Sequence, residues 1–261
     1  MTTRDLLAAY DAQLRTDPET LGAIDVARLG PLWLVTFGGG HGFVTYRDLE
    51  GWDAPATALG VRAALDHFRA DPAVEQVEWK TRAHDVVDGL HDALTASGFV
   101  AEEPESIMVG ELSGLVSDVT LPAGVTVRTV ADEDDVRAMT AMQQIGFGDD
   151  VSAHMADALL ERLAQGDGLQ LWVAEFDGMI VSAGRLEPVA GTDFAGIWGG
   201  VTLPEWRGRG IYRALTAARA RSAMAVGKTL AHSDSTEYSR PILERSGLVK
   251  VSTTTPYQWH R

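Results

Sequence analysis

Cysteine is absent from the sequence, and long apolar runs and positive charge are scarce. Without cysteine, the chain cannot form a disulfide, a thiolate nucleophile or a Cys-based metal site. The seven histidines show no HExxH or comparable spacing, so we expect no metal. No apolar run approaches the roughly 20 residues that span a bilayer. Residues 1–10 also lack the basic-then-apolar order of a secretory signal, so a cytoplasmic protein is the default expectation.

The charge balance is acidic, because 22 Lys and Arg against 37 Asp and Glu give a formal net charge of -15. Such a charge repels phosphate groups, so we expect neither nucleic acid nor an anionic membrane as a partner. It favours a cationic substrate, although a solubilising acidic surface is the commoner reason for this balance. With 45% hydrophobic and 23% charged residues, the chain has the composition of a soluble globular protein.

The length of 261 residues exceeds the usual size of one compact domain and favours two. Small residues and proline between Ser113 and Gly124 are typical of a linker. We therefore predict an N-terminal domain at residues 1–115, a linker at 116–124 and a C-terminal domain at 125–261.

Hydrophobic periodicity and turn residues predict the elements of both domains. In the first we expect helices at 5–14, 56–69 and 86–97, and strands at 33–37, 43–46, 74–82 and 107–112. In the second we expect strands at 125–130, 169–176, 179–186, 194–203, 229–231 and 249–259, two helices before 164, and helices at 211–225 and from about 240. Asp177-Gly178 is the strongest hairpin signal. Strand–helix–strand crossings predict an α/β fold of the α+β kind, with a partly parallel mixed sheet covered by helices.

Two segments resemble each other and suggest an internal repeat. Ala83-His-Asp85 is followed by LTASGF at 94–99, and Ala231-His-Ser-Asp234 is followed by LERSGL at 243–248. Chance matching of short strings is the alternative explanation. If the repeat is real, the protein consists of two related half-folds in tandem.

Residues 199–212 (GGVTLPEWRGRGIY) lie between a predicted strand and a predicted helix. The free N–H groups and positive dipole of a helix N-terminus attract anions, and Gly208 and Gly210 remove the Cβ atoms that would keep a phosphate away. The loop can therefore hold a pyrophosphate, and the alternative is a solvated, arginine-rich turn. Neither a P-loop nor a Rossmann site is expected, because GxxxxGK[ST] is absent and Arg213 stands where the third glycine of GxGxxG would be.

Residues 204–215 (PEWRGRGIYRAL) resemble the acetyl-CoA signature R/Q-x-x-G-x-G/A of the Gcn5-related N-acetyltransferase (GNAT) superfamily. The resemblance extends over about 125–261, where ILERSGL at 242–248 is similar to the family's L-Y-E-K-x-G-F. It implies a GNAT-like acyl-CoA N-acyltransferase fold with acetyl-CoA as cosubstrate. If the repeat is real, the N-terminal half resembles a smaller, degenerate GNAT-like domain. We expect it to bind no CoA, because Glu50-Gly-Trp-Asp53 places acid where a phosphate would lie.

By this resemblance, N–H groups of the loop bind the CoA pyrophosphate, and the preceding strand pairs with the pantetheine and polarises the thioester carbonyl. The implied cosubstrate-binding residues are Gly200, Val201, Thr202, Leu203, Arg207, Gly208, Arg209, Gly210, Ile211 and Tyr212. Tyr212 departs from the family pattern, because it occupies the position of the last glycine or alanine. We expect the phosphate contact there to come from the backbone and the tyrosine side chain to point aside.

The catalytic groups follow the family pattern less closely. Where many members have a tyrosine that protonates the leaving thiolate, this chain has Leu243, and Tyr238 is the candidate substitute. A base is needed because an alkylamine is mostly protonated at pH 7. The candidate bases are Glu187, Asp193, His232 and Glu237, for which surface charge or ordinary packing is the alternative role. His232-Ser-Asp-Ser235 does not indicate a hydrolase triad, because adjacent strand residues point to opposite faces and no GxSxG is present.

The predicted function is transfer of an acetyl group from acetyl-CoA to a primary amine by direct attack. The acceptor would be a small molecule or a peptide N-terminus. Leu243 and the lack of an obvious base favour the alternative of a noncatalytic acyl-CoA-binding module, and a pure interaction protein is a third interpretation. The final strand offers a pairing edge for a homodimer.

Overall fold

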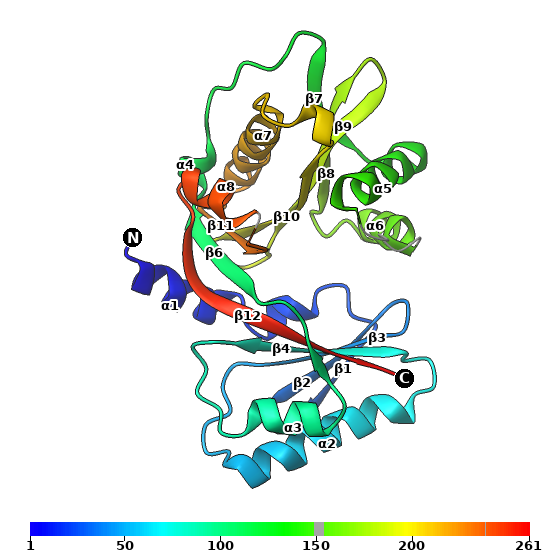
Figure 1. The fold of residues 1–261 in the computed structure, drawn as a ribbon, viewed down its shortest axis with the longest axis vertical. Helices are drawn as coiled ribbons and strands as arrows, with labels where there is room; N and C mark the ends of the chain where they lie inside the picture. Colours follow the sequence, from blue (N-terminus) through cyan, green and yellow to red (C-terminus); the bar gives the residue numbers. More distant parts are fainter. Residues whose placement is uncertain (149–153, 238) are drawn as a thin grey trace. The chain divides into compact units, whose positions relative to one another are not determined.

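The computed structural model describes residues 1–148, 154–237 and 239–261 (Figure 1). The chain forms two compact units, each with its own hydrophobic core. Unit 1 comprises residues 1–108, 234–240 and 250–261, and unit 2 comprises residues 109–233 and 241–249. The units are therefore discontinuous in sequence, unlike the predicted domains at 1–115 and 125–261. The main difference is that residues 250–261 belong to unit 1.

Unit 1 contains a sheet with the strand order β1-β2-β3-β4-β12, and β5 pairs with β12. Strands β1 to β3 are antiparallel neighbours, β3 and β4 run parallel, and β4 and β12 run antiparallel. The elements are α1 (Thr3–Gln13), the 3-10 helix η1 (Asp17–Thr20), β1 (Asp25–Leu29), β2 (Leu32–Phe37), β3 (His41–Tyr46), α2 (Ala54–Ala70), β4 (Gln76–Arg82), α3 (Leu90–Ala96), β5 (Val100–Ala101) and β12 (Val249–His260).

The core of unit 1 lies between the sheet and helices α2 and α3. Phe68 of α2, Leu94 of α3, Trp79 of β4 and Trp259 of β12 belong to one buried cluster. Because successive strand residues alternate between faces, Trp79 points into this core and its neighbours on β4 point to the other face. Helices α2 and α3 cover this face of the sheet, and β4 presents polar residues on the opposite face, where they lie near the buried Tyr10 of α1.

That polar face of β4 carries buried ion pairs. The Nζ atom of Lys80 lies 2.8 Å from a carboxylate oxygen of Asp234 and 3.9 Å from one of Glu19. Arg82, which is 2% exposed, pairs with Glu19 through a short hydrogen bond. Glu78, on the same face of β4, accepts a hydrogen bond from Gln258 at 3.2 Å. Unit 1 therefore contains a network of mostly buried charged groups on one face of β4.

Unit 2 contains strands in the order β7-β8-β9-β10-β11. Neighbours from β7 to β10 are antiparallel, and β10 and β11 run parallel. Helices α5 and α6 cover one face of this sheet and α7 covers the other (Figure 1). The elements are α4 (Leu112–Leu115), β7 (Val125–Val130), α5 (Glu133–Phe147), α6 (His154–Gln165), β8 (Gln170–Phe176), β9 (Met179–Pro188), β10 (Phe194–Thr202), the 3-10 helix η2 (Pro204–Trp206) and α7 (Ile211–Ala225). Three further elements contain residues of both units: β6 (Glu105–Glu111), β11 (Leu230–Ser235) and α8 (Arg240–Arg245).

The mixed α/β fold predicted from the sequence is confirmed. Asp177-Gly178 joins β8 to β9 as a hairpin, and α7 has the predicted bounds. The parallel pairing of β10 with β11 on either side of α7 is the predicted strand–helix–strand crossing. Strands β1 and β5 and helix α4 were not predicted. Within the part of the chain that the structure describes, no helix combines the length and apolarity needed to cross a bilayer.

Candidate functional site

The candidate site is organised around an irregularity in β10. The antiparallel pairing of β10 with β9 changes register between Trp198 and Val201. Gly199 and Gly200 form the resulting bulge, and Gly199 has a φ of +59°, in the left-handed region that glycine adopts readily. The strand is therefore kinked at two glycines, and the second of them, Gly200, begins the stretch 200–203 to which the resemblance assigned the pantetheine and thioester contacts.

Beyond the pairs that join them, β10 and β11 diverge. Their parallel pairing runs from Phe194↔Leu230 to Gly196↔His232. The pairing thus ends two residues before Trp198, and the bulge lies in the part of β10 that has left β11. We call this stretch, in which β10 no longer pairs with β11, the splay. Diverging parallel strands expose backbone N–H and C=O groups to a ligand.

Two side chains from opposite layers hold the bulge. Gln143 of α5 donates from Nε2 to the carbonyl oxygen of Gly199 at 2.8 Å. Arg219 of α7 donates from Nη1 to the carbonyl oxygens of Arg185 at 3.1 Å and Trp198 at 3.4 Å. Burial lowers the pKa of the Arg219 guanidinium. No role was predicted from the sequence for Gln143 or Arg219.

Two glycines make room for this arrangement. A Cβ atom on Gly184 would lie 2.5 Å from Nη1 of Arg219, so any other residue there would require the guanidinium to shift. A Cβ atom on Gly200 would lie 2.7 Å from Cε2 of Tyr212. The Tyr212 side chain therefore packs against Gly200 of β10. This is the direction in which it points aside from the loop, as the sequence led us to expect.

The loop from η2 to α7 leaves its backbone accessible. Gly208 has a φ of +73°, and a Cβ atom there would have no neighbour within 4 Å. Gly210 caps α7 with a φ of +79° and accepts at its carbonyl from the N–H of Ala214 at 2.9 Å. Because glycine has no side chain, this cap leaves the N–H groups of the first turn for a ligand. A helix N-terminus of this kind binds anions such as a pyrophosphate.

The arginines of the loop also shape it. Arg207 donates from Nε to the carbonyl oxygen of Thr202 at 2.9 Å and from Nη2 to that of Gly146 at 3.1 Å. Arg209 lies 4.8 Å from the ring centre of Trp206 and donates to the carbonyl oxygen of Glu205 at 2.9 Å. These contacts tie the loop together and keep two positive charges beside the N-terminus of α7.

Two of the strand residues predicted to bind the cosubstrate, Thr202 and Leu203, already have polar partners in β9. The N–H of Leu203 donates to the carbonyl oxygen of Val181 at 3.0 Å, so it already has a partner in β9. The hydroxyl of Thr202 lies 2.8 Å from that of Ser182. Any contribution of Leu203 to cosubstrate binding must therefore come from its side chain or carbonyl.

Of the predicted bases, Glu187 reaches the face of β10 that α5 and α6 cover. It stands opposite Gly196 in the β9–β10 register, on the same side of the sheet as Trp198. Its carboxylate lies 3.0 Å from Nη1 of Arg162 and 3.4 Å from Nε of Arg185. Asp193, in contrast, precedes β10, and six residues of strand place it about 20 Å from Gly199. The structure does not bring Asp193 to the bulge.

The other described candidates for a base, His232 and Glu237, each have a partner of their own. The ring of His232 packs edge-on against Trp198, with ring centres 5.1 Å apart. Glu237 pairs with Arg240 at 2.8 Å. Tyr238 lies outside the described residues. Leu243, at the position of the family tyrosine, is 3% exposed and packs in the interior.

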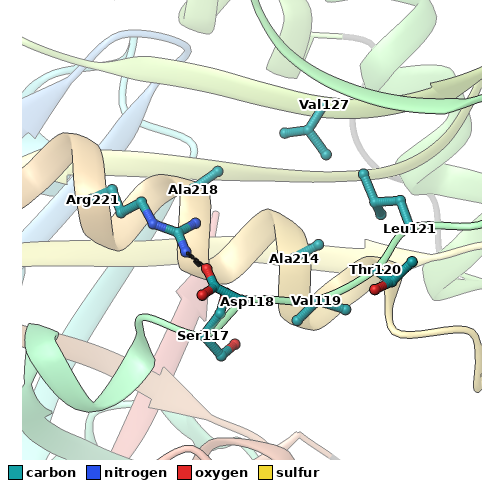
Figure 2. A pocket seen from close by; sticks show the side chains of 9 residues that line it. All are labelled: Ser117, Asp118, Val119, Thr120, Leu121, Val127, Ala214, Ala218 and Arg221. Carbon is teal, nitrogen blue, oxygen red and sulfur yellow. Dashed lines mark hydrogen bonds and ion pairs between the residues drawn. The ribbon is translucent and has the colours of Figure 1, made fainter.

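The segment predicted as a linker packs against α7 (Figure 2). Arg221 donates to the carbonyl of Ser117 and the carboxylate of Asp118, both at 3.0 Å. A methyl group of Val119 would meet a Cβ atom on Gly210 at 2.9 Å. A pocket of about 340 Å³ lies beside this contact and is lined by Ser117, Asp118, Val119, Thr120, Leu121, Val127, Ala214, Ala218 and Arg221. Residues 117–121 are thus part of unit 2 and not a free tether.

Comparison with known proteins places these features in context. Residues 136–247 match the acetyltransferase (GNAT) family, and none of the curated proteins compared with the chain matches it. A GCN5-related N-acetyltransferase from Kribbella flavida is 18% identical, with a TM-score of 0.67 over 98% of this chain and 93% of its own. A GCN5-related N-acetyltransferase from Sphaerobacter thermophilus is 17% identical, with a TM-score of 0.61 over 88% of this chain and 76% of its own. A tandem GNAT protein from the clavulanic acid biosynthesis pathway, solved without AcCoA, is 14% identical, with a TM-score of 0.60 over 90% and 81%. These likenesses are of fold.

Proposed function

Because residues 136–247 form a domain of the acetyltransferase (GNAT) family, we propose that the protein transfers an acetyl group from acetyl-CoA to a primary amine. The family supports an acyl-CoA-dependent acetyltransferase in general. The observation that carries the specific proposal is the bulge of β10, followed directly by a glycine loop at the N-terminus of α7. These two features offer N–H groups to a thioester and to a pyrophosphate, at positions joined by one short loop.

Acetyl-CoA is the substrate that fits both features. Its pyrophosphate would accept hydrogen bonds from N–H groups between Gly208 and Tyr212, where Gly208 leaves open space. Arg207 and Arg209 would lower the energy of the bound negative charge in an otherwise acidic chain. Its pantetheine arm would occupy the splay between β10 and β11, and its thioester would lie at the bulge.

The reaction we propose is direct. The amine nitrogen forms a bond to the thioester carbon, the carbon–sulfur bond breaks, and the electron pair leaves on the sulfur of CoA. The amine must lose one proton, and the sulfur or solvent takes one up. The developing negative charge on the thioester oxygen would be stabilised by N–H groups of the bulge, an effect typically worth a few kcal/mol for each donor.

Among the predicted bases, we propose that Glu187 receives the proton of the amine through water. Its carboxylate lies within ion-pair distance of Arg162 and Arg185, which hold it on this face of the sheet. Glu187 also lies on the face of β10 that carries Trp198. The acceptor is proposed to be a small molecule or a peptide N-terminus that approaches from this face.

A noncatalytic acyl-CoA-binding module is the second candidate. It is favoured by Leu243, whose apolar side chain cannot protonate a leaving thiolate. Such a protein would use the same loop and splay, so CoA binding alone does not separate the two functions. Release of CoA in the presence of a panel of primary amines separates them, because a module binds acetyl-CoA without turnover.

Thermal unfolding with and without acetyl-CoA tests the binding step. Gly208→Asp places a carboxylate beside the proposed phosphates, and Gly208→Asn is a matched control with the same backbone demand and no charge. Gly208 is preferable to Gly210, where any side chain would also meet Val119. Ligand at 100 times Kd should stabilise the wild type by about 2.7 kcal/mol.

We expect the Asn variant to keep this shift and the Asp variant to lose most of it. If the wild type shows no shift, the proposed function is wrong. If both variants respond like the wild type, acetyl-CoA binds elsewhere on the protein.

A further inference from the structure

Arg219 is an unusual residue for the middle of a packed helix. It is 1% exposed, and its guanidinium donates to the carbonyls of Arg185 and Trp198 and to the hydroxyl of Thr216. The side chain of Tyr212 also interacts with the guanidinium and acts against the lowering of its pKa by burial. Burial of a cation among uncharged groups is energetically costly. An apolar side chain would fill the same space without that cost, so the charge itself calls for an explanation.

The position of the guanidinium relative to the sheet is specific. Arg185 and Trp198 are the last residue pair of β9 and β10 before the register changes. Arg219 binds the carbonyls of both, and it fills the space beside Gly184, which lies opposite the bulge. The side chain therefore bridges the two strands at the point where their own ladder of hydrogen bonds is interrupted.

Holding the carbonyl of Trp198 also orients the next N–H group. The peptide between Trp198 and Gly199 is trans and planar, so its C=O and N–H point in opposite directions. The carbonyl of Trp198 points toward Arg219. The N–H of Gly199 therefore points in the opposite direction, toward the edge of β10 that no longer pairs with β11. A hydrogen bond from a cation to the carbonyl also polarises the peptide and strengthens its N–H as a donor.

The next peptide, between Gly199 and Gly200, is held from the other side of the sheet, by helix α5. Gln143 of α5 donates to the carbonyl oxygen of Gly199 at 2.8 Å. The bulge is thus held at two consecutive carbonyls, one by a residue of α7 and one by a residue of α5. Such a backbone needs little reorganisation when a ligand binds, which is the condition for electrostatic preorganisation.

We infer that Arg219 is a positioning residue, which holds the Trp198 carbonyl so that the N–H of Gly199 faces the thioester oxygen of acetyl-CoA. The inference rests on the proposed function, since it concerns the same site. Beyond that function, the inference explains why the N–H of Gly199 has its orientation. The residue responsible, Arg219, does not itself touch the substrate.

The test measures the thioester itself and needs no knowledge of the acceptor. Acetyl-CoA with an isotopically labelled thioester carbonyl is bound to the full-length protein, and the infrared stretch of that carbonyl is recorded. The variants are Arg219→Met, which keeps bulk and removes the cation, and Arg219→Lys, which keeps the charge but cannot bridge both carbonyls in the same way. Ser222→Ala is the control, because it removes another hydrogen bond from α7 to the sheet, to Gln170, away from the bulge.

In the wild type and in Ser222→Ala, we expect the bound carbonyl to absorb at lower frequency than in solution. In both Arg219 variants the frequency should return toward the solution value, while Kd for acetyl-CoA changes by no more than about threefold. With an active amine, kcat should fall about tenfold or more with little change in KM for acetyl-CoA, since loss of one oxyanion donor typically lowers kcat by about 10²–10³.

The possible failures are distinguishable. If the wild type does not bind acetyl-CoA, the proposed function is wrong and this inference falls with it. If the wild type binds and shifts the carbonyl but Arg219→Met preserves the shift, the proposed function stands and the role of Arg219 is wrong. Should Arg219→Met fail to fold, Arg219→Lys carries the same comparison.

Discussion

The ring of Tyr212 lies against the α-carbon of Gly200, so that a Cβ atom there would be 2.7 Å from Cε2 and 2.9 Å from the hydroxyl oxygen. This contact joins the first turn of α7 to the bulge of β10. The proposed pyrophosphate site and the proposed thioester site are therefore packed against each other, and displacement of one affects the other.

Gly200→Ala should therefore destabilise the protein by about 1–3 kcal/mol, because the new methyl group overlaps a packed ring. The φ of Gly200 is outside the left-handed region, so the ring contact is the expected cause. Urea unfolding measures the effect. The double variant Gly200→Ala/Tyr212→Ala should be less sensitive to the added methyl than the single variant. Equal effects of Gly200→Ala in both backgrounds would show that the ring is not responsible.

In unit 1, Glu19→Gln should destabilise the protein by about 3–5 kcal/mol, because it leaves the buried cation of Arg82 without its partner. The exposed pair of Asp66 with Arg69 supplies the control, since Asp66→Asn should change stability by no more than about 0.5 kcal/mol. Urea unfolding at pH 7 compares the two. Similar small effects would mean that the buried pair is as weak as the surface one.

The effect of Glu19 should also depend on pH. Burial acts to raise the pKa of Glu19, but Arg82 and Lys80 outweigh it and hold the pKa below the ordinary value of 4.5. A carboxyl with a depressed pKa stabilises the folded state above its unfolded-state pKa, and this contribution is lost as the pH falls through the folded-state pKa. The stability difference between wild type and Glu19→Gln should therefore shrink in acid below pH 4.5.

Glu78 should show the opposite dependence. Burial raises its pKa above the ordinary value of 4.5, although Lys80 and Gln258 act against the shift. Folding then favours the protonated form, so its stabilising contribution is present below pH 4.5 and is lost as the pH rises through the folded-state pKa. Glu78→Gln mimics the protonated form. Its melting temperature should exceed that of the wild type at pH 7, with the advantage disappearing below pH 4.5; an advantage that grows in acid would reverse the assignment.

At the proposed active site, Glu187→Gln should lower the rate of acetyl transfer at pH 7 by about 10²-fold, the lower end of the range for a general base. The loss should diminish at high pH, where more of the amine is already neutral. Asp193→Asn discriminates between the two predicted carboxylates, since Asp193 lies far along β10 from the bulge. A larger loss in the Asp193 variant, or a constant deficit at all pH values, would contradict the role of Glu187.

The sequence predicted local features well because they depend on nearby residues. The Asp177-Gly178 hairpin and helix 211–225 are set by turn chemistry and periodicity within a few positions. Strand β1 was missed because Asp25–Leu29 is an edge strand with mostly exposed side chains, and its composition lacks the apolar alternation of a strand packed on a core. The pairing of β12 with β4 joins residues more than 170 positions apart, and no local pattern encodes it.

In the candidate site too, only the features with a local sequence signal were predicted. The loop from Arg207 to Tyr212 has a motif, and a motif can be read without a structure. Gln143 and Arg219 lie in helices where polar residues usually face solvent, so nothing in their local sequence indicates burial. The only signal was indirect: Gly184 and the Gly199-Gly200 pair mark places where strands make room for other groups.

The strand β12 also constrains how the chain acquires its structure. Residues 254–260 pair with residues 76–82, and Tyr257 and Trp259 complete the core of unit 1. Synthesis on the ribosome delivers the N-terminal portion first, yet that portion cannot close its sheet until residues 250–261 have emerged. Vectorial, unit-by-unit folding is thereby excluded for unit 1. Its sheet is completed late, and until then β4 presents an unpaired edge that a chaperone or another nascent chain can engage.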